Sequence, residues 1–244
     1  MCPMVASQWA ARPGELRLPD NEIHVWRAFL DDERASDHHA ILSEDERARA
    51  SRFVFPRDRN HFVASRGILR SLIGRYLQRP AETIDFSYNP QGKPRLRDTG
   101  IPIRFNLSHS HGIALYAFST HRELGIDVEA IRSEFTGEQI AERFFSLKEL
   151  AELRSVPPEK RHEAFFLCWT RKEAYVKARG GGLGISLDSF EVSLTPGMPE
   201  TLVSTDSGRW MLRSFQPAAL YAGALVAERG DWCLRLWDWQ PGAR

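Results

Sequence analysis

Hydrophobic and polar positions recur along this chain with two periods, one of two residues and one of three to four. Alternation with period two is typical of strands, and apolar positions at spacing i, i+3 and i+4 are typical of amphipathic helices. Strands are predicted over residues 22–30, 83–88, 103–107, 113–118, 188–194, 210–215, 221–227 and 232–239, with one more that carries Asp127 and Glu129. Long helices are predicted over residues 57–76 and 159–179.

The order of these elements occurs twice. Ser43 and Ser146 lie 103 residues apart, and each begins a capping-box pattern that predicts a short helix. A strand precedes each serine, and a proline break and a long helix follow it. We therefore predict an α+β fold with two pseudo-symmetric halves, residues 1–122 and 123–244. Each half is expected to be a small antiparallel sheet packed against a long helix, with the active site in the cleft between the halves.

The composition of the chain argues against a nucleic-acid-binding, membrane-spanning or disulfide-rich protein. The 244 residues are 42% apolar and 27% charged, with a formal net charge of +1, so no broad electrostatic field attracts nucleic acid or membrane. No apolar stretch reaches the roughly 18 residues that span a bilayer, and the N-terminus lacks the pattern of a signal peptide. Three widely spaced cysteines without a Cys-x-x-Cys motif argue against a disulfide framework and a zinc site. We expect a cytoplasmic, monomeric protein.

Two acidic residues on one strand suggest where the chemistry lies. Ile126 and Val128 alternate with Asp127 and Glu129, so both carboxylates project from the same face of the strand. Carboxylates this close repel each other, and Mg²⁺ relieves the repulsion while leaving sites open for phosphate oxygens. A solvated strand face explains the same pattern, and the Asp-x-Glu motif alone does not separate the two interpretations.

A second motif lies on the helix predicted over residues 159–179. Trp169, Glu173 and Lys177 are spaced i, i+4 and i+8 and share one helix face. A surface Glu–Lys pair is the simpler interpretation, but the neighbouring aromatic residues indicate that this helix is buried on several sides. A third carboxylate and a lysine near the acidic strand would complete a site for Mg²⁺ and a pyrophosphate.

Two turns add candidate ligands for phosphate. Ser108 and His109 follow a predicted strand, where the histidine either donates to a phosphate or is satisfied by backbone. Lys93 and Pro94 belong to a tight turn that places one cation at its tip, although most such turns have no further role.

Five stretches taken in order resemble the 4′-phosphopantetheinyl transferases of the long, pseudo-dimeric Sfp type. They are Gly92-Lys-Pro94, Phe105-Asn-Leu-Ser-His-Ser110, Gly125-Ile-Asp-Val-Glu129, Phe144-Phe-Ser146 and Trp169-Thr-Arg-Lys-Glu-Ala-Tyr-Val-Lys177. The resemblance implies transfer of phosphopantetheine from coenzyme A, the co-substrate, to a serine of an acyl or peptidyl carrier protein. The released product would be adenosine 3′,5′-bisphosphate.

The resemblance also implies roles for individual residues. Asp127, Glu129 and Glu173 would hold Mg²⁺, while Lys177 and His109 would bind the pyrophosphate with Ser108 nearby. The first half would bind the nucleotide, with Lys93 and Pro94 at the adenine and Arg49 and Arg66 as candidates for the 3′-phosphate. The proton of the carrier serine would pass to Glu173 or to a metal-bound water that Glu173 holds, and Asp127 and Lys177 would be the other catalytic residues.

Two functions other than phosphopantetheinyl transfer fit the same residues, and the surface that would bind the carrier protein also has two interpretations. A Mg²⁺-dependent hydrolase of nucleotide diphosphates would use the same site with water, and a non-catalytic protein could simply bind coenzyme A. The segment Ile131–Gly137 and the helix entered through Phe144, Phe145 and Ser146 are expected to form a patch for the carrier protein, with Ile131, Arg132, Phe135 and Arg143 as its apolar and basic residues. A solvated loop is the alternative for this segment.

Overall fold

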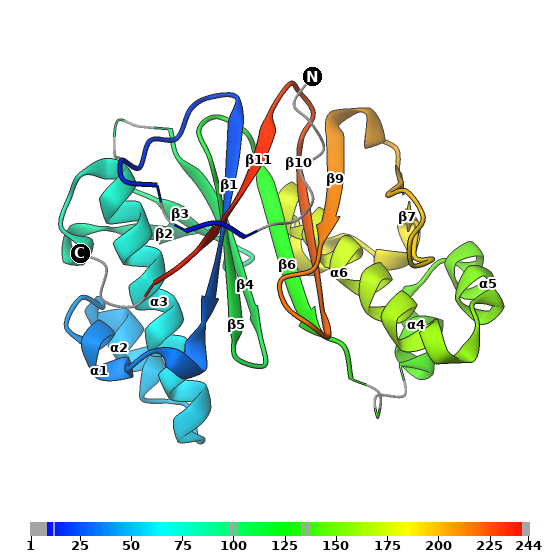
Figure 1. The fold of residues 1–244 in the computed structure, drawn as a ribbon, viewed down its shortest axis with the longest axis horizontal. Coiled ribbons are helices and arrows are strands. Elements are labelled where there is room, and N and C mark those ends of the chain that lie inside the picture. Colours follow the sequence, from blue (N-terminus) through cyan, green and yellow to red (C-terminus); the bar gives the residue numbers. More distant parts are fainter. Residues whose placement is uncertain are drawn as a thin grey trace.

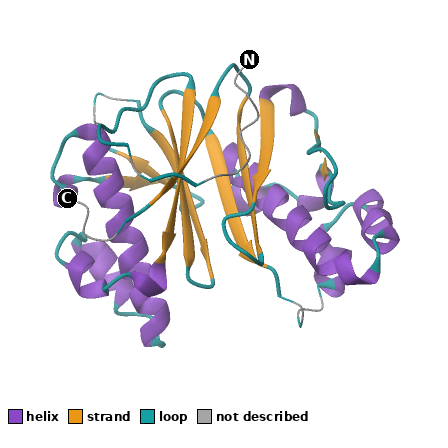
Figure 2. Ribbon diagram, in the orientation of Figure 1, coloured by secondary structure: helices purple, strands orange, loops and turns teal. Residues whose placement is uncertain are grey.

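The computed structural model describes residues 9–11, 13–97, 100, 102–132, 134 and 137–240, with only the backbone of Leu183. Two sheets face each other at the centre of the molecule, and one long helix covers the outer face of each sheet (Figures 1 and 2). The chain therefore forms four layers: helix, sheet, sheet and helix. The predicted α+β fold with two halves and two long helices is confirmed.

The first half contains eight helices and strands among the described residues. They are β1 (Glu22–Phe29), α1 (Ala35–His39), α2 (Glu44–Ala50), α3 (Pro56–Leu77), β2 (Phe86–Tyr88), β3 (Pro94–Leu96), β4 (Arg104–Ser110) and β5 (Ile113–Ser119).

The second half follows the same order and then adds strands. Its elements are β6 (Leu124–Ala130), α4 (Glu138–Phe144), α5 (Leu147–Ser155), α6 (Arg161–Arg179), β7 (Glu191–Val192), β8 (Leu202–Val203), β9 (Trp210–Phe215), β10 (Tyr221–Glu228) and β11 (Cys233–Asp238). Short 3₁₀ turns span Leu30–Asp32, Ala81–Thr83, Pro158–Lys160, Gly182–Gly184, Leu187–Ser189 and Ser207–Arg209.

The two central sheets differ in strand direction. One sheet has the order β6-β10-β9 and is antiparallel throughout. The other has the order β11-β1-β5-β4, in which β11 runs parallel to β1 and the remaining pairs are antiparallel. The first sheet of the chain is thus mixed, and it is completed by a strand from the second half, which the sequence analysis did not anticipate.

Three hydrophobic clusters lie between the four layers. Apolar side chains of α3 pack against β1, β4 and β5, and apolar side chains of α6 pack against β9 and β10. A third cluster lies between the two sheets and includes Ile23, Val25, Ile126 and Val128. Because strand side chains alternate between faces, burying Ile126 and Val128 between the sheets turns Asp127 and Glu129 toward α6.

The internal repeat extends to a buried ion pair in each half. Ser43 and Ser146 begin α2 and α5 with capping boxes, as predicted. The glutamates of these boxes, Glu46 and Glu149, are almost fully buried. Arg70 of α3 donates to Glu46 at 2.5 Å, and Lys172 of α6 lies 2.7 Å from Glu149. Each capping glutamate therefore ties its short helix to the long helix of the same half.

Some predicted boundaries are wrong. The strand predicted over 83–88 begins only at Phe86, after a 3₁₀ turn, and the one predicted over 188–194 shrinks to Glu191–Val192. Cys168 is buried with a free thiol, whereas Cys233 is disulfide-bonded, so the prediction against disulfides is wrong for Cys233. Within the described part of the chain, no helix is long and apolar enough to cross a membrane.

Candidate active site

Strand β6 and helix α6 approach each other closely at Gly125. A Cβ atom on Gly125 would lie 2.2 Å from the carbonyl oxygen of Ala174 and from the amide nitrogen of Ala178. Only glycine therefore allows the backbone of α6 to rest on β6 at this point. The contact brings Glu173 and Lys177 beside the carboxylates of the strand.

Strand β4 of the first half holds the acidic strand of the second half through its polar side chains. The Ser108 hydroxyl donates to Asp127 Oδ1 at 2.8 Å, and the Ser110 hydroxyl donates to Glu129 Oε2 at 2.7 Å. Asn106 Oδ1 accepts the amide N–H of Ile126 at 2.8 Å. Asn106, Ser108 and Ser110 alternate along β4, so one face of this strand aligns both carboxylates. Asn106 and Ser110 belong to the motif of residues 105–110, but no role was predicted for them, although their period-two spacing is visible in the sequence.

Lys177 lies at the centre of the cluster. Its ammonium is 2.6 Å from Asp127 Oδ1 and 3.1 Å from the Ser108 hydroxyl. Asp127 is buried, and its second oxygen, Oδ2, has no hydrogen-bond partner within the described structure. Lys177 therefore contacts the acidic strand, whereas Glu173 forms no ion pair within 4 Å among the described residues. The surface Glu–Lys pair of the simpler interpretation is absent from this part of the chain.

Burial and the charge of Asp127 disfavour ionisation of the remaining two carboxyls, Glu129 and Glu173. Burial raises the pKa of the Glu129 carboxyl, and the charge of Asp127 raises it further, against the hydrogen bond from Ser110. Burial and the charge of Asp127 also raise the pKa of the Glu173 carboxyl, against the charge of Lys177. A cation between these groups would lower the free energy of their ionised forms.

The donor set fits a hard divalent cation such as Mg²⁺. Asp127 raises the pKa values of both Glu129 and Glu173, so the three carboxylates interact with one another, and the buried Asp127 Oδ2 has no hydrogen-bond partner among the described residues. The carboxylates do not enclose an ion in their present positions, because no group of three or more His, Cys, Asp or Glu side chains in the described residues is close enough to hold a metal. Side-chain rotation would have to complete the coordination.

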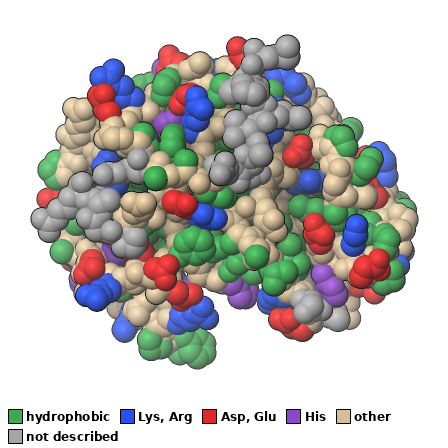
Figure 3. All heavy atoms as spheres, viewed as in Figure 1, with side chains coloured by type: hydrophobic (Ala, Val, Ile, Leu, Met, Phe, Trp, Pro, Cys, Tyr) green, Lys and Arg blue, Asp and Glu red, His purple; other side chains and the backbone are tan. Residues whose placement is uncertain are grey.

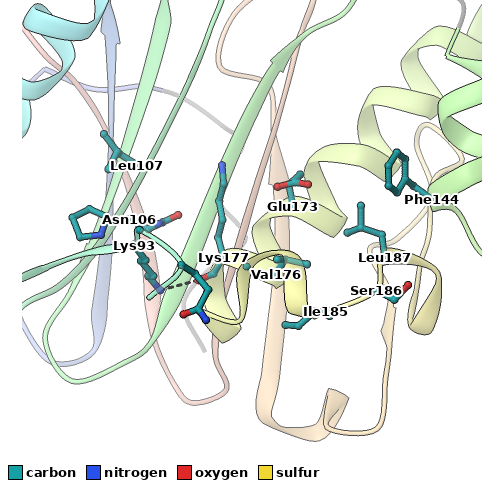
Figure 4. A pocket seen from close by; sticks show the side chains of 15 residues that line it. Lys93, Asn106, Leu107, Phe144, Glu173, Val176, Lys177, Ile185, Ser186 and Leu187 are labelled. Carbon is teal, nitrogen blue, oxygen red and sulfur yellow. Dashed lines mark hydrogen bonds between the residues drawn. The ribbon is translucent and has the colours of Figure 1, made fainter. Parts of the chain in front are cut away.

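A cavity of about 480 Å³ opens beside this cluster, between the two halves. Figure 4 shows Glu173, Val176 and Lys177 on the helix side, with Lys93, Asn106 and Leu107 on the side of the first half. The described lining is completed by Gln91, Gly92, Pro94, Phe144, Gly180, Gly182, Ile185, Ser186 and Leu187. The cavity is thus built from both halves, as predicted for the cleft.

Lys93 lines the cavity and connects two elements of the second half. Its ammonium donates to the carbonyl oxygens of Leu124 at 3.1 Å and of Lys177 at 2.8 Å, and it lies 3.6 Å from Glu123. Burial lowers the pKa of the Lys93 ammonium, against the charge of Glu123. Lys93 therefore ties the start of β6 to the end of α6. Its place beside the adenine, like that of Pro94, stays a prediction.

Because strand side chains alternate, His109 lies on the opposite face of β4 from Ser108, the face whose apolar residues pack against α3. The His109 side chain is exposed. Burial lowers the pKa of the His109 imidazole, and the charges of Lys177, His61 and Arg49 lower it further. A basic zone therefore extends from α6 across β4 to α2 and α3. The sequence analysis did not single out His61, whose Nε2 lies 2.8 Å from Asp31 Oδ1.

The two candidates for the 3′-phosphate differ in their surroundings. Arg66 is buried, with its guanidinium 2.5 Å from Glu46 and 3.1 Å from the Tyr88 hydroxyl. Arg49 stacks over the Phe62 ring at 5.4 Å and forms no ion pair with any described residue. Both arginines line a small cavity of about 200 Å³. Because Glu46 already compensates Arg66, Arg49 is the better placed of the two for an anion.

The predicted carrier patch is described only in part. Phe135 lies outside the described residues. Phe145 is buried in the core, where its ring stacks on Phe165, so it does not belong to a surface patch. Phe144 lines the cavity and packs edge-on against Trp169, and the exposed Arg143 lies over its ring at 5.2 Å. The patch itself stays a prediction.

Comparison with known proteins identifies the family. A model of the 4′-phosphopantetheinyl transferase superfamily matches residues 123–234, and a model of the N-terminal region of 4′-phosphopantetheinyl transferases matches residues 26–121. The chain is 39% identical over 240 residues to the 4′-phosphopantetheinyl transferase HetI of Nostoc sp., covering 97% of this chain and 100% of that relative. It is 33% identical over 156 residues to Sfp of Bacillus subtilis, covering 64% of this chain and 67% of that one.

A holo-(acyl-carrier-protein) synthase of Bacillus anthracis, solved in complex with coenzyme A, is 22% identical with a TM-score of 0.38, over 43% of this chain and 94% of that one. The match to HetI runs over nearly the whole chain, and the two family models cover its halves in order. The protein therefore belongs to the 4′-phosphopantetheinyl transferases of the Sfp type.

Proposed function

We propose that this protein transfers the 4′-phosphopantetheine group from coenzyme A to a serine of an apo acyl or peptidyl carrier protein. The serine hydroxyl oxygen forms a bond to the β-phosphorus, the bond from that phosphorus to the bridging oxygen breaks, and adenosine 3′,5′-bisphosphate leaves. One observation carries the proposal: Asp127, Glu129, Glu173 and Lys177 gather beside a cavity that both halves line.

Mg²⁺ fits the proposal as the metal, held by Asp127, Glu129 and Glu173. When bound, it would neutralise negative charge on the pyrophosphate and on the leaving group. The support is the buried Asp127 Oδ2, which has no hydrogen-bond partner in the described part of the chain, and the raised pKa values of Glu129 and Glu173, whose ionised forms a cation would favour.

The side chains of the chain itself supply the other steps. Lys177 stabilises the charge that develops on the pyrophosphate oxygens, because its partly exposed ammonium can turn from Asp127 toward the cavity. Glu173 takes the proton of the carrier serine, directly or through a water molecule. Its raised pKa suits a general base, which works best when its pKa is near the working pH.

The basic zone of the first half suits the nucleotide end of coenzyme A. His109 is neutral at pH 7 in the free protein and donates one N–H to the pyrophosphate. Arg49 contacts the 3′-phosphate, with His61 beside it, and Pro94 lines the adenine end of the cavity. Arg66 is a positioning residue: it donates to Glu46 and to the Tyr88 hydroxyl and so holds this part of the first half in place.

Intact-mass analysis of several apo carrier proteins, incubated with enzyme, coenzyme A and Mg²⁺, tests the proposal. A transferase adds one phosphopantetheine group to the carrier and releases the bisphosphate only when the carrier is present. A hydrolase would consume coenzyme A without a carrier, and a non-catalytic binder would release nothing. Either of these two results would overturn the proposal. The monomeric state and the cytoplasmic location stay predictions from the sequence.

A further inference from the structure

The connection between α2 and α3 exposes large apolar side chains. Phe53 is 37% exposed, Val54 85% and Phe55 67%, and we call these three residues the 53–55 loop. Figure 3 shows hydrophobic side chains gathered at the lower tip of the first half, where Figure 1 places the start of α3. Contiguous apolar surface of this kind marks an interaction site in a soluble protein.

The 53–55 loop is held in one conformation by its neighbours. The Phe53 ring packs on the Phe62 ring with centroids 5.3 Å apart. The Phe53 amide donates to the carbonyl oxygen of Ala50 at 3.3 Å, and the Phe55 carbonyl oxygen accepts from Arg59 at 3.1 Å. A partner therefore meets a preorganised apolar surface, which reduces the entropy lost on binding.

Basic residues surround the 53–55 loop. Residues 47–59 contain five arginines and a single acid, Asp58. Arg57 pairs with Asp31 at 3.0 Å, but Arg49, Arg52 and Arg59 form no ion pair among the described residues. An apolar centre with a basic rim is complementary to an apolar patch edged by carboxylates.

The 53–55 loop lies beside Arg49, the candidate ligand for the 3′-phosphate. Phe62, on which Phe53 packs, also carries the Arg49 guanidinium over its ring. Arg49 acts electrostatically on His109, which also senses Lys177 of the catalytic cluster. Because the proposed function places the 3′-phosphate at Arg49, a carrier protein that brings its serine to the pyrophosphate of coenzyme A can contact this loop.

We propose that the 53–55 loop is the first-half part of the docking surface for the carrier protein. The proposal rests on the transferase function and adds a surface across the cleft from Arg143 and Phe144. The carrier would contribute an apolar patch edged by acidic side chains. A second copy of this chain fits less well, because a two-fold contact through the loop would bring Arg52 and Arg59 against their own copies.

The test compares two double variants with a matched control. Val54→Ser with Phe55→Ser removes the apolar centre, and Arg52→Glu with Arg59→Glu reverses the rim. Met198→Ser changes a side chain that is 59% exposed on the connection between β7 and β8. We expect each double variant to raise KM for the carrier roughly fivefold to thirtyfold, with KM for coenzyme A unchanged. Met198→Ser should leave both constants unchanged.

Binding of a carrier whose serine is replaced by alanine gives a readout that needs no catalysis. The Kd should rise in both double variants, and added salt should weaken the wild-type complex more than the charge-reversed one. Unchanged carrier KM and Kd would overturn the proposal. The proposal would also be overturned if the double variants changed only the sedimentation of the protein, which would indicate a second copy as the partner. A change only in binding to anionic phospholipid vesicles would overturn it as well. Failure of the wild-type enzyme to modify any carrier would instead overturn the proposed function.

Discussion

Replacing Asp127 with asparagine keeps the shape of the side chain and removes its charge. Two effects on the metal-free protein then oppose each other. The ion pair with Lys177 at 2.6 Å is lost, although the asparagine oxygen still accepts from Ser108. The repulsion of Glu129 and Glu173, both of whose pKa values Asp127 raises, is lost as well.

The two effects have opposite signs, so the net change is smaller than the larger of the two. A hydrogen bond to a charged group contributes about 1.5–3 kcal/mol, and the lower end applies here because the Lys177 side chain is 28% exposed and can be rehydrated. We expect the free energy of unfolding without Mg²⁺ to change by less than about 1.5 kcal/mol, or roughly 3–6 °C in melting temperature. Mg²⁺ at a hundredfold excess over its Kd stabilises the wild-type protein by about 2.7 kcal/mol, or roughly 5–10 °C.

Thermal melting with and without Mg²⁺, together with carrier modification, provides the assay. Asp127→Asn should lose the rise in melting temperature that Mg²⁺ causes, and transfer should fall about a hundredfold to a thousandfold. Asp231 is an exposed aspartate far from the cluster in the sequence, so Asp231→Asn serves as the control. This variant should keep both the Mg²⁺-dependent rise in melting temperature and wild-type transfer. A variant that retains the Mg²⁺-dependent rise and wild-type transfer would refute the metal assignment.

Three further variants test other parts of the site. Lys177→Ala should lower kcat more than it raises KM for coenzyme A, because the negative charge is greatest in the transition state; a pure KM effect would contradict this role. Arg49→Ala should raise KM for coenzyme A but not for its analogue without the 3′-phosphate, and equal losses with both donors would remove Arg49 from the phosphate site. Glu173→Gln tests the raised pKa of Glu173. Ionised Glu173 destabilises the fold above its raised pKa, so without Mg²⁺ the variant should melt higher than wild type at neutral pH. That difference should vanish as the pH falls below the ordinary carboxyl value of 4.5, and a difference independent of pH would contradict the argument.

Local periodicity explains why the main elements could be predicted from the sequence. The helices α3 and α6 lie within two residues of their predicted bounds, because long amphipathic patterns with clear end signals are unambiguous. The alternation around Asp127 also placed both acids on one face. The short strands β3 and β8 carry too few residues for a period to appear, and α1 and α4 are stabilised by contacts outside their own sequence.

The sequence predicts which residues form the site but not which of them contact one another. Lys177 pairs with Asp127 and not with Glu173, because Gly125 lets α6 rest directly on β6. Arg66 is neutralised by Glu46, twenty residues before it, which no charge count reveals. His61 joins the basic zone only because α3 places it opposite β4. Each of these facts depends on how two elements pack, which residue spacing alone does not encode.

The parallel pairing of β11 with β1 fixes the order in which a newly synthesised chain can finish folding. The ribosome produces β1 near the beginning of this sequence and β11 near its end. Until β11 emerges, one edge of β1 keeps unpaired amide and carbonyl groups, and an open edge of this kind invites pairing with other chains. The first half therefore cannot close its sheet before β11 has been synthesised, and folding intermediates that lack β11 expose this edge of β1.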